Sequence, residues 1–422
     1  MRLQFRIASV VLQPTTVCNL DCAYCYLPER AVNRRMEPGV AQAVARSVAE
    51  LRSRVEVLWH AGEPLAGGLE RFTILAEPFR LLEREGLVEH HVQTNGTLID
   101  DRWCALFRER AIRVGVSLDG PEWANRERRD RAGRASFAPV LAGMAALRRN
   151  GLSFAILAVI GDESLDRAAE LYEFFCQTGC RGVGVLVEEP QPVTPRSVPD
   201  QDERVVRFWA ELLEAWRRDP RIEVRELSEI LRWMEDPSLY NPSGREITVN
   251  MYPTVAFDGT VSLLAPEFVN LPELVAGNVL QDSLLTIAER WRETRYVVDY
   301  VEGLNACRRE CAYFSHCLGG TAASKYFALG TTAGTETAFC RNSRQRPVRA
   351  ILQALGRRPT PFRDLKRVVR ARALEVSRLA RSVGVPEPRP AGSLLVKPDL
   401  TRLSVAGSRR RPRGMTPQSL LT

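Results

Sequence analysis

Short apolar stretches alternate with amphipathic helical patterns over residues 6–187, and this alternation limits the possible fold more than any other feature of the sequence. Strands separated by helices of this length predict a parallel sheet built from right-handed βαβ units. Six such units predict an α/β fold, a partial (β/α)6 barrel of the TIM-like type that does not close. The expected strands are residues 7–12, 55–59, 89–93, 112–117, 154–160 and 182–187. The expected helices are residues 39–52, 69–84, 101–110, 137–149 and 165–178.

The rest of the chain differs in composition from this core of residues 1–187. We expect a proline-rich linker with helices, then a β-rich cysteine-bearing region, then a basic tail, at residues 188–244, 245–346 and 347–422. Helical patterns in these parts cover residues 202–218, 227–234 and 361–382. Beyond Gly384 the sequence is rich in Pro, Gly and Arg, which is typical of disorder.

The net charge of +8 is concentrated at the C-terminal end of the chain. Residues 341–422 contain 20 of the 59 Lys and Arg residues but only 4 of the 51 Asp and Glu residues, so the remainder is mildly acidic. A basic tail can bind nucleic acid. This one has Phe362 as its only aromatic residue and no recognition motif, so we do not expect a nucleic-acid partner.

The sequence also indicates the compartment of the protein and the role of its cysteines. No apolar run approaches the ~20 residues that a membrane helix needs, so no membrane partner is expected. The first residues lack the apolar segment and cleavage site of a signal peptide, which predicts a cytoplasmic protein. Ten cysteines in a reducing compartment are more typical of metal ligands than of disulfides.

Three cysteines lie on one short segment, at Cys18, Cys22 and Cys25. Three thiolates can hold three corners of a four-iron cluster and leave one iron open to another ligand, whereas a closed cluster takes four cysteines. From spacing alone, a zinc site or unrelated thiols are alternatives. Zinc would need a fourth Cys or His close by, and the nearest histidine is His60.

This spacing, with Tyr24 before the last cysteine, resembles the signature loop of the radical S-adenosylmethionine superfamily. Residues 60–64 (HAGEP) are similar to the family's Gly-Gly-Glu-Pro segment, from which Ala61 departs. Residues 93–96 (QTNG) and 117–121 (SLDGP) also match. Each of the four motifs follows an expected strand, and parallel α/β sheets bind ligands at the carboxyl ends of their strands.

The resemblance implies a [4Fe–4S] cluster held by the three-cysteine loop, with S-adenosylmethionine bound at its open iron. The residues it assigns to the cofactor are Gly62, Glu63 and Pro64 for the amino group, Arg128 for the carboxylate, and Asn95 and Ser117 for the nucleoside. It also implies an external one-electron reductant such as flavodoxin or ferredoxin.

A second cysteine group consists of Cys307, Cys311, Cys317 and Cys340, the complement of a closed cluster, although four thiolates can also hold a structural zinc. Its context resembles the SPASM extension of peptide-modifying radical enzymes, which implies an auxiliary [4Fe–4S] cluster. Many of those enzymes hold two. Residues 251–268 contain no cysteine where further ligands would lie, so we expect a single auxiliary cluster.

Within that class, the motifs most resemble the cyclophane-forming peptide maturases. The resemblance implies a carbon–carbon crosslink between an aromatic ring and a Cβ of a ribosomally made precursor peptide. Formylglycine or thioether formation are alternatives, as is a noncatalytic iron–sulfur carrier, although a carrier has no need of Glu63 and Arg128. Asp119 and Glu267 are candidate catalytic bases, though either can instead stabilise a turn.

The remaining cysteines and His60 have a simpler interpretation. Cys104, Cys176 and Cys180 lie in or beside helical patterns, where free cysteine commonly acts as a small buried hydrophobe. We expect His60 to be a packed side chain rather than an acid or base. No separate leader-binding domain is recognisable, so either an exposed strand edge or the basic tail would capture a leader peptide.

Overall fold

The computed structural model describes residues 2–189, 202–236, 246–356 and 373–385. All six expected strands are present, and three have the expected bounds. They are β2 (Ser9–Leu12), β3 (Val55–Trp59), β4 (Val88–Thr94), β5 (Arg113–Ser117), β6 (Phe154–Ile160) and β7 (Gly182–Val187). Ala8 divides the first expected strand, and the residues before it form β1 (Arg2–Ile7).

The expected helices follow these strands. They are α1 (Pro38–Glu50), α2 (Leu69–Ala76), α3 (Arg80–Arg84), α4 (Asp101–Glu109), α5 (Phe137–Arg149) and α6 (Ala168–Thr178). The single helix expected over residues 69–84 is interrupted by a 3-10 turn, η2 (Glu77–Phe79), which contains Pro78. Proline has no N–H to donate to the preceding turn, so the α-helix cannot continue unchanged through it.

The strands β2 to β7 lie side by side in chain order and are all parallel. β8 (Glu223–Val224) extends this sheet beyond β7, while α7 (Asp202–Arg218) and α8 (Arg225–Glu235) flank it in the chain. Beyond β2, the strand β10 (Thr254–Val255) pairs in parallel, and β11 (Thr260–Ser262) and β12 (Gly277–Asn278) follow antiparallel. The α/β class is therefore confirmed, but within the described residues the sheet is mixed and has ten strands rather than six.

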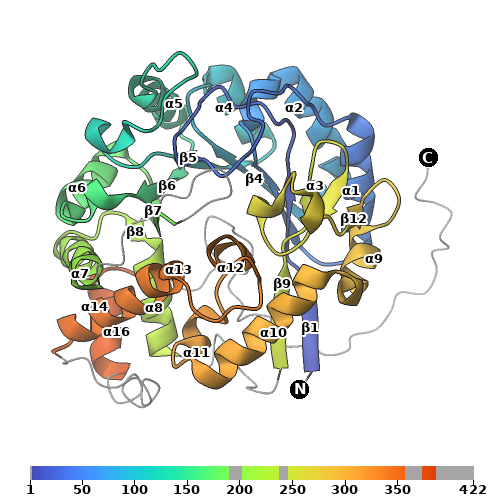
Figure 1. Ribbon diagram of the computed structural model, residues 1–422. Helices are drawn as coiled ribbons and strands as arrows, with labels where there is room; N and C mark the ends of the chain where they lie inside the picture. Colours follow the sequence, from blue (N-terminus) through green and yellow to red (C-terminus); the bar gives the residue numbers. More distant parts are fainter. Residues whose placement is uncertain (1, 190–201, 237–245, 357–372, 386–422) are drawn as a thin grey trace.

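Figure 1 shows the helices that follow the strands on the outer side of a curved sheet, and α12 (Ala322–Leu329) on the opposite, inner side. β1 leaves this sheet and pairs in parallel with β9 (Glu246–Met251). No helix in the described ranges is long and apolar enough to cross a membrane.

The expectation of a β-rich region over residues 245–346 is wrong beyond β12. From residue 284 onward this region is helical, with α9 (Leu284–Glu289), α10 (Arg295–Glu310), α11 (Phe314–Cys317), α12 and α13 (Ala338–Cys340). A π-helical turn (Arg341–Gln345) then leads into α14 (Arg346–Ala354). Several of these helices are too short to show a helical period in the sequence. Of the basic helix expected over residues 361–382, only α16 (Ala373–Ser382) lies within the described residues.

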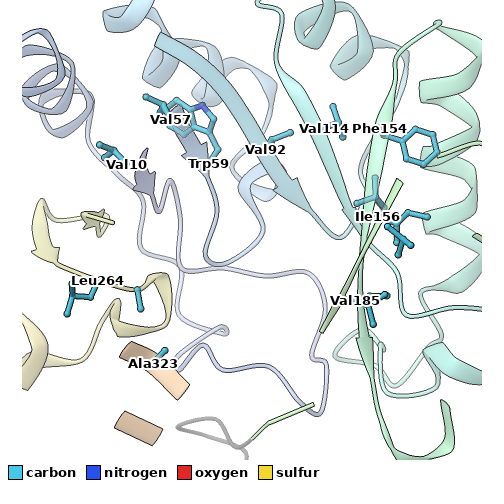
Figure 2. Packing of buried hydrophobic residues seen from close by; sticks show 14 of the residues in the cluster. Val10, Val57, Trp59, Val92, Val114, Phe154, Ile156, Val185, Leu264 and Ala323 are labelled. Carbon is cyan, nitrogen blue, oxygen red and sulfur yellow. The ribbon is translucent and has the colours of Figure 1, made fainter. Parts of the chain in front are cut away.

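One hydrophobic core joins the sheet to the C-terminal helices. Figure 2 shows Val57, Val92 and Ile156 on the strands, with Leu264 and Ala323 on the later segments. All five belong to one cluster of buried residues. Val57 and Val92 are fully inaccessible, and Leu264 and Ala323 keep about 5–6% exposure. The cysteine-bearing helices are thus packed against the sheet rather than tethered beside it.

Candidate active site

Four loops meet at one edge of the sheet because β2, β3, β4 and β5 are parallel neighbours. The cysteine loop follows β2, residues 60–64 follow β3, residues 93–96 contain the end of β4 and residues 117–121 the end of β5. The structure therefore brings the four sequence motifs together, as their positions after strands predicted.

The cysteine loop is braced by the segment that carries Arg128. The backbone N–H groups of Asp21 and Ala23 donate to the carbonyls of Arg129 (2.6 Å) and Glu127 (3.1 Å). As whole residues, the three cysteines of the loop are of intermediate burial. Burial, followed by the charge of Glu63, raises the pKa of the Cys18 thiol to about 12. Iron binding at this thiol must therefore release a proton.

Glu63 ties two of the loops together. Its carboxylate is 1% exposed and accepts hydrogen bonds from the Leu65 N–H (3.0 Å), the Thr94 hydroxyl (2.7 Å) and the Asn95 N–H (2.8 Å). Burial raises its pKa, and these hydrogen bonds oppose the shift. Gly62 precedes it at a φ of +79°, where a Cβ would lie 2.2 Å from the Thr15 carbonyl oxygen, so only glycine fits.

Asn95 and Ser117, the expected nucleoside contacts, are both bound to protein groups. The Asn95 side chain donates to Asn19 Oδ1 at 2.8 Å and lies 3.8 Å from Cys18 Sγ, so it links the third loop to the cysteine loop. Ser117 Oγ accepts from Gln93 Nε2 at 2.8 Å. The other amide atom, Gln93 Oε1, is buried without a hydrogen-bond partner among the described residues. A bound ligand that donates a hydrogen bond would satisfy it.

Asp119, one expected catalytic base, has structural partners instead of an open carboxylate. It accepts hydrogen bonds from the Tyr24 hydroxyl and the Val159 N–H (3.0 Å), and it lies 3.6 Å from the Arg128 guanidinium. Arg128 also donates to the Tyr24 hydroxyl. Asp119 and Arg128 are 2% and 6% exposed. Burial raises the pKa of Asp119, and Arg128 opposes the shift. This network fixes the cysteine loop to the end of β5.

Glu267, the other expected base, lies within electrostatic reach of a second carboxyl group. It sits in a 3-10 turn (Pro266–Phe268), and burial raises its pKa. Glu189 lies two residues beyond the end of β7 at Val187, and its side chain is hydrogen-bonded to Ser324. Burial, opposed by this bond but assisted by the charge of Glu267, raises the pKa of Glu189 to about 8. Glu189 therefore keeps its proton near neutral pH beside Glu267.

Tyr26 and His60 connect the carboxyl pair to the cysteine loop. The Tyr26 hydroxyl lies 2.9 Å from His60 Nε2. Burial, then the charge of Glu267 and that of Cys25, raises the pKa of Tyr26 well above its ordinary value. Burial lowers the pKa of His60 to about 4, so its imidazole is neutral near pH 7. This agrees with the expectation of a packed histidine.

The second cysteine group gathers around the helices α10 to α13. Cys307 lies in the last turn of α10, and Cys317 and Cys340 end α11 and α13. Burial raises the pKa of the Cys307, Cys311 and Cys340 thiols, and each is also affected by the charge of Cys317, so the four sulfurs lie within electrostatic reach of one another.

Neither cysteine group fits a single metal ion. Among the described residues, no three His, Cys, Asp or Glu side chains converge as ligands of one ion. Zinc requires its sulfur ligands at about 2.3 Å from one centre. The thiolates of a four-iron cluster lie at separate corners of the cluster, so they need not converge on one ion. Cys104 and Cys180 lie in the hydrophobic core and Cys176 packs against it, as expected for structural thiols.

Sequence reasoning missed Tyr24 as a bridge between Asp119 and Arg128, and it missed Glu189 and Ser324 altogether. Of these residues, only Tyr24 could have been identified from the sequence, because its position between Cys22 and Cys25 places it at the sheet edge. Glu189 stands at the start of a proline-rich stretch and Ser324 in a short helix, and neither carries a pattern that marks a site.

A parallel βα sheet with a three-cysteine loop and three further motif loops at one edge defines an enzyme of the radical S-adenosylmethionine class. The chain belongs to the Radical SAM superfamily, whose family profile matches residues 12–175. S-adenosylmethionine and a [4Fe–4S] cluster are the cofactors typical of this superfamily.

Two curated relatives extend over most of the chain. The uncharacterized protein sll1766 of Synechocystis sp. is 30% identical over 369 residues, which cover 82% of this chain and 91% of the relative. A serine-type anaerobic sulfatase-maturating enzyme of Bacteroides thetaiotaomicron is 26% identical over 343 residues, which cover 74% and 81% of the two chains.

Two solved structures share the fold. Native anSMEcpe with bound AdoMet and Cp18Cys peptide has a TM-score of 0.68 and 22% identity, covering 84% of this chain and 98% of that one. Streptococcus suis SuiB bound to precursor peptide SuiA has a TM-score of 0.58 and 16% identity, covering 79% and 75%. The likeness to both includes the region after the parallel strands.

Replacing Cys18, Cys22 and Cys25 together by Ala should remove one of two clusters. We expect iron to fall from about eight to about four atoms per chain after anaerobic reconstitution, and S-adenosylmethionine cleavage to be lost. Iron analysis and chromatography of 5′-deoxyadenosine measure the two effects. Cys104→Ala, which removes a core thiol, should retain both clusters and cleavage. Cleavage surviving in the triple variant would contradict the site.

Glu189→Gln should change how stability depends on pH. The folded-state pKa of about 8 lies above the ordinary value of 4.5, so the folded chain keeps a proton that the unfolded chain releases. The stability of the parent should therefore decline as the pH rises through this window, whereas glutamine does not titrate. Anaerobic calorimetry should show the Tm of the variant gaining on that of the parent with rising pH. A constant difference would place Glu189 in an ordinary environment.

Proposed function

We propose that this enzyme is a peptide maturase that installs a carbon–carbon (cyclophane) crosslink between an aromatic ring and a Cβ of a ribosomally made precursor peptide. The proposal rests on the motif resemblance and on one structural observation. Two carboxyl groups, Glu189 and Glu267, lie between the two cysteine groups. Glu267 acts electrostatically on Tyr26 beside the cysteine loop, and Glu189 is hydrogen-bonded to Ser324 near the second cysteine group.

The connection starts at the three-cysteine loop. Tyr26 follows Cys25 directly, and its hydroxyl responds to the charges of Cys25 and Glu267. Glu267 in turn acts on Glu189. A proton acceptor is thus available beside the loop that would hold the catalytic cluster.

The connection ends at the second cysteine group. Glu189 is hydrogen-bonded to Ser324. The next residue, Lys325, directs its ammonium group to Cys307 Sγ at 3.7 Å. A substrate bound against the carboxyl pair would therefore have a radical source on one side and a cluster that accepts electrons on the other.

When bound, the cofactor supplies a 5′-deoxyadenosyl radical that takes one hydrogen atom from the peptide Cβ. The Cβ radical then adds to a nearby aromatic carbon, which the site must hold close enough for an effectively intramolecular step. Restoring the aromatic ring releases one proton and one electron. Glu267 takes the proton, because burial makes its carboxylate a stronger base. The net change is the loss of two hydrogens per crosslink.

The comparisons support a peptide or protein substrate, but they do not distinguish a crosslink from other modifications. One relative is named a sulfatase-maturating enzyme, one structural neighbour holds a Cp18Cys peptide and another a precursor peptide.

Formylglycine formation is the second candidate, because a relative covering most of the chain is a serine-type sulfatase-maturating enzyme. In that reaction the carbon radical is oxidised to an aldehyde instead of adding to a ring. The same base and electron acceptor would serve it. Only the product distinguishes the two reactions.

Glu267→Gln should separate hydrogen abstraction from proton removal. We expect 5′-deoxyadenosine to form while crosslinked peptide falls by about 10²–10⁴-fold, the usual contribution of a general base. Glu273→Gln, which neutralises an exposed carboxylate six residues further on, should leave product formation unchanged. Chromatography of both products after one incubation makes the comparison. Parallel retention of both in the Glu267 variant would assign the proton to another group.

The product itself tests the proposed reaction. A peptide encoded beside the gene for this chain, co-expressed with it, should lose two hydrogens per crosslink and resist fragmentation between the linked residues. Tandem mass spectrometry measures both. Hydrazine trapping is the control, since it captures an aldehyde but not a crosslink. A trapped aldehyde, or a modified cysteine sulfur, would replace the cyclophane assignment with one of its alternatives.

A further inference from the structure

Lys325 is an unusual residue for this chain. Only three of its 59 basic residues are lysines, and Lys325 is the first of them in the sequence. Lys325 is 1% exposed and is among the largest fully buried side chains of the described residues. A buried ammonium is costly unless an opposite charge lies near it. Although nearly all basic residues of this chain are arginines, a lysine occupies this position, where burying its charge costs free energy.

The neighbours of Lys325 are sulfur and an aromatic ring. Its ammonium nitrogen lies 3.7 Å from Cys307 Sγ and 5.4 Å from the centre of the Tyr300 ring. Within the described ranges, no carboxylate forms a salt bridge with it. Lys325 also lies near the N-terminal end of α12, where the helix dipole already disfavours a cation. Beyond the Tyr300 ring, anionic cysteine sulfurs would supply the compensating opposite charge.

We propose that Lys325 is the electrostatic partner of the auxiliary cluster and raises its reduction potential. This inference rests on the proposed function, because it takes the second cysteine group as the ligands of that cluster. A cluster held by four thiolates is negatively charged, which supplies the missing opposite charge. The ammonium group donates to the sulfur of one ligand, and hydrogen bonds to sulfur and local charge are among the factors that set the potential of such clusters.

The direction of the effect follows from the charge. One-electron reduction adds a negative charge to the cluster, and a buried cation nearby stabilises the reduced form more than the oxidised form. Lys325 therefore makes the cluster a better electron acceptor. That is the property needed to take up the electron released when the aromatic ring is restored. Lys325 acts through the cluster and is a positioning residue.

The test uses the full-length chain with Cys18, Cys22 and Cys25 replaced by Ala, so that the auxiliary cluster alone titrates. Its midpoint potential is measured by EPR-monitored redox titration, together with iron content, in Lys325→Met, Lys325→Gln and Lys325→Arg. Arg309→Gln is the control, because it removes an exposed cation two residues from Cys307. Solvent screens that charge.

We expect Lys325→Met and Lys325→Gln to disfavour reduction at least tenfold, a drop of about 59 mV for one electron. Lys325→Arg should stay near the parent, and Arg309→Gln should not move. If the neutral variants lose their iron while Lys325→Arg keeps it, the charge is needed to hold the cluster, which supports Lys325 as its electrostatic partner.

Three results would overturn the inference. Neutral variants that hold four irons and titrate with the parent would remove the electrostatic role while leaving the cluster in place. Loss of iron in Lys325→Arg as well would make the requirement one of shape. A parent without auxiliary iron would refute the cluster assignment itself, and with it this inference, which iron analysis reveals before any titration.

Discussion

The buried carboxylate of Glu63 is the interaction on which the sheet edge depends. Its three hydrogen bonds join the loop after β3 to the loop after β4, and Asn95 continues the connection to the cysteine loop. Each donor would otherwise be buried without a partner, at a cost of about 1–3 kcal/mol per group. The loops are therefore held in place by the protein itself, so a cofactor meets a site that is already arranged.

A second buried carboxylate extends this arrangement. Asp119 fixes Tyr24, and hence the cysteine loop, to the end of β5. On the other side, the pairing of β10 with β2 brings the later part of the chain to the same sheet. Glu267 thereby comes within electrostatic reach of Tyr26, and α12 carries Ser324 to Glu189. Two cysteine groups about 300 residues apart in sequence are related through one sheet.

The parallel strands were predictable because strands covered on both faces are continuous apolar runs, as in residues 154–160 and 182–187. The motif loops were predictable because parallel order fixes which ends meet. Glu189 was not, since its role depends on Ser324 and Glu267, which lie far away in the chain. The helical nature of residues 284–354 also escaped prediction. Although α10 has 16 residues, the neighbouring helices α9, α11 and α13 have only three to six residues and show no helical period. Lys325 stands out in the sequence as one of three lysines, but only the structure shows that it is buried.

We propose that Cys18, Cys22 and Cys25 hold the cluster at this sheet edge, and that S-adenosylmethionine would bind at its open iron through the amino and carboxylate groups of the cofactor. Electron–nuclear double resonance of the reduced enzyme measures this directly, with the cofactor labelled with ¹⁵N at the amino group and ¹³C at the carboxylate. The account predicts hyperfine coupling of both labels to the cluster. A reduced cluster that shows coupling to neither label, under saturating cofactor, would contradict it.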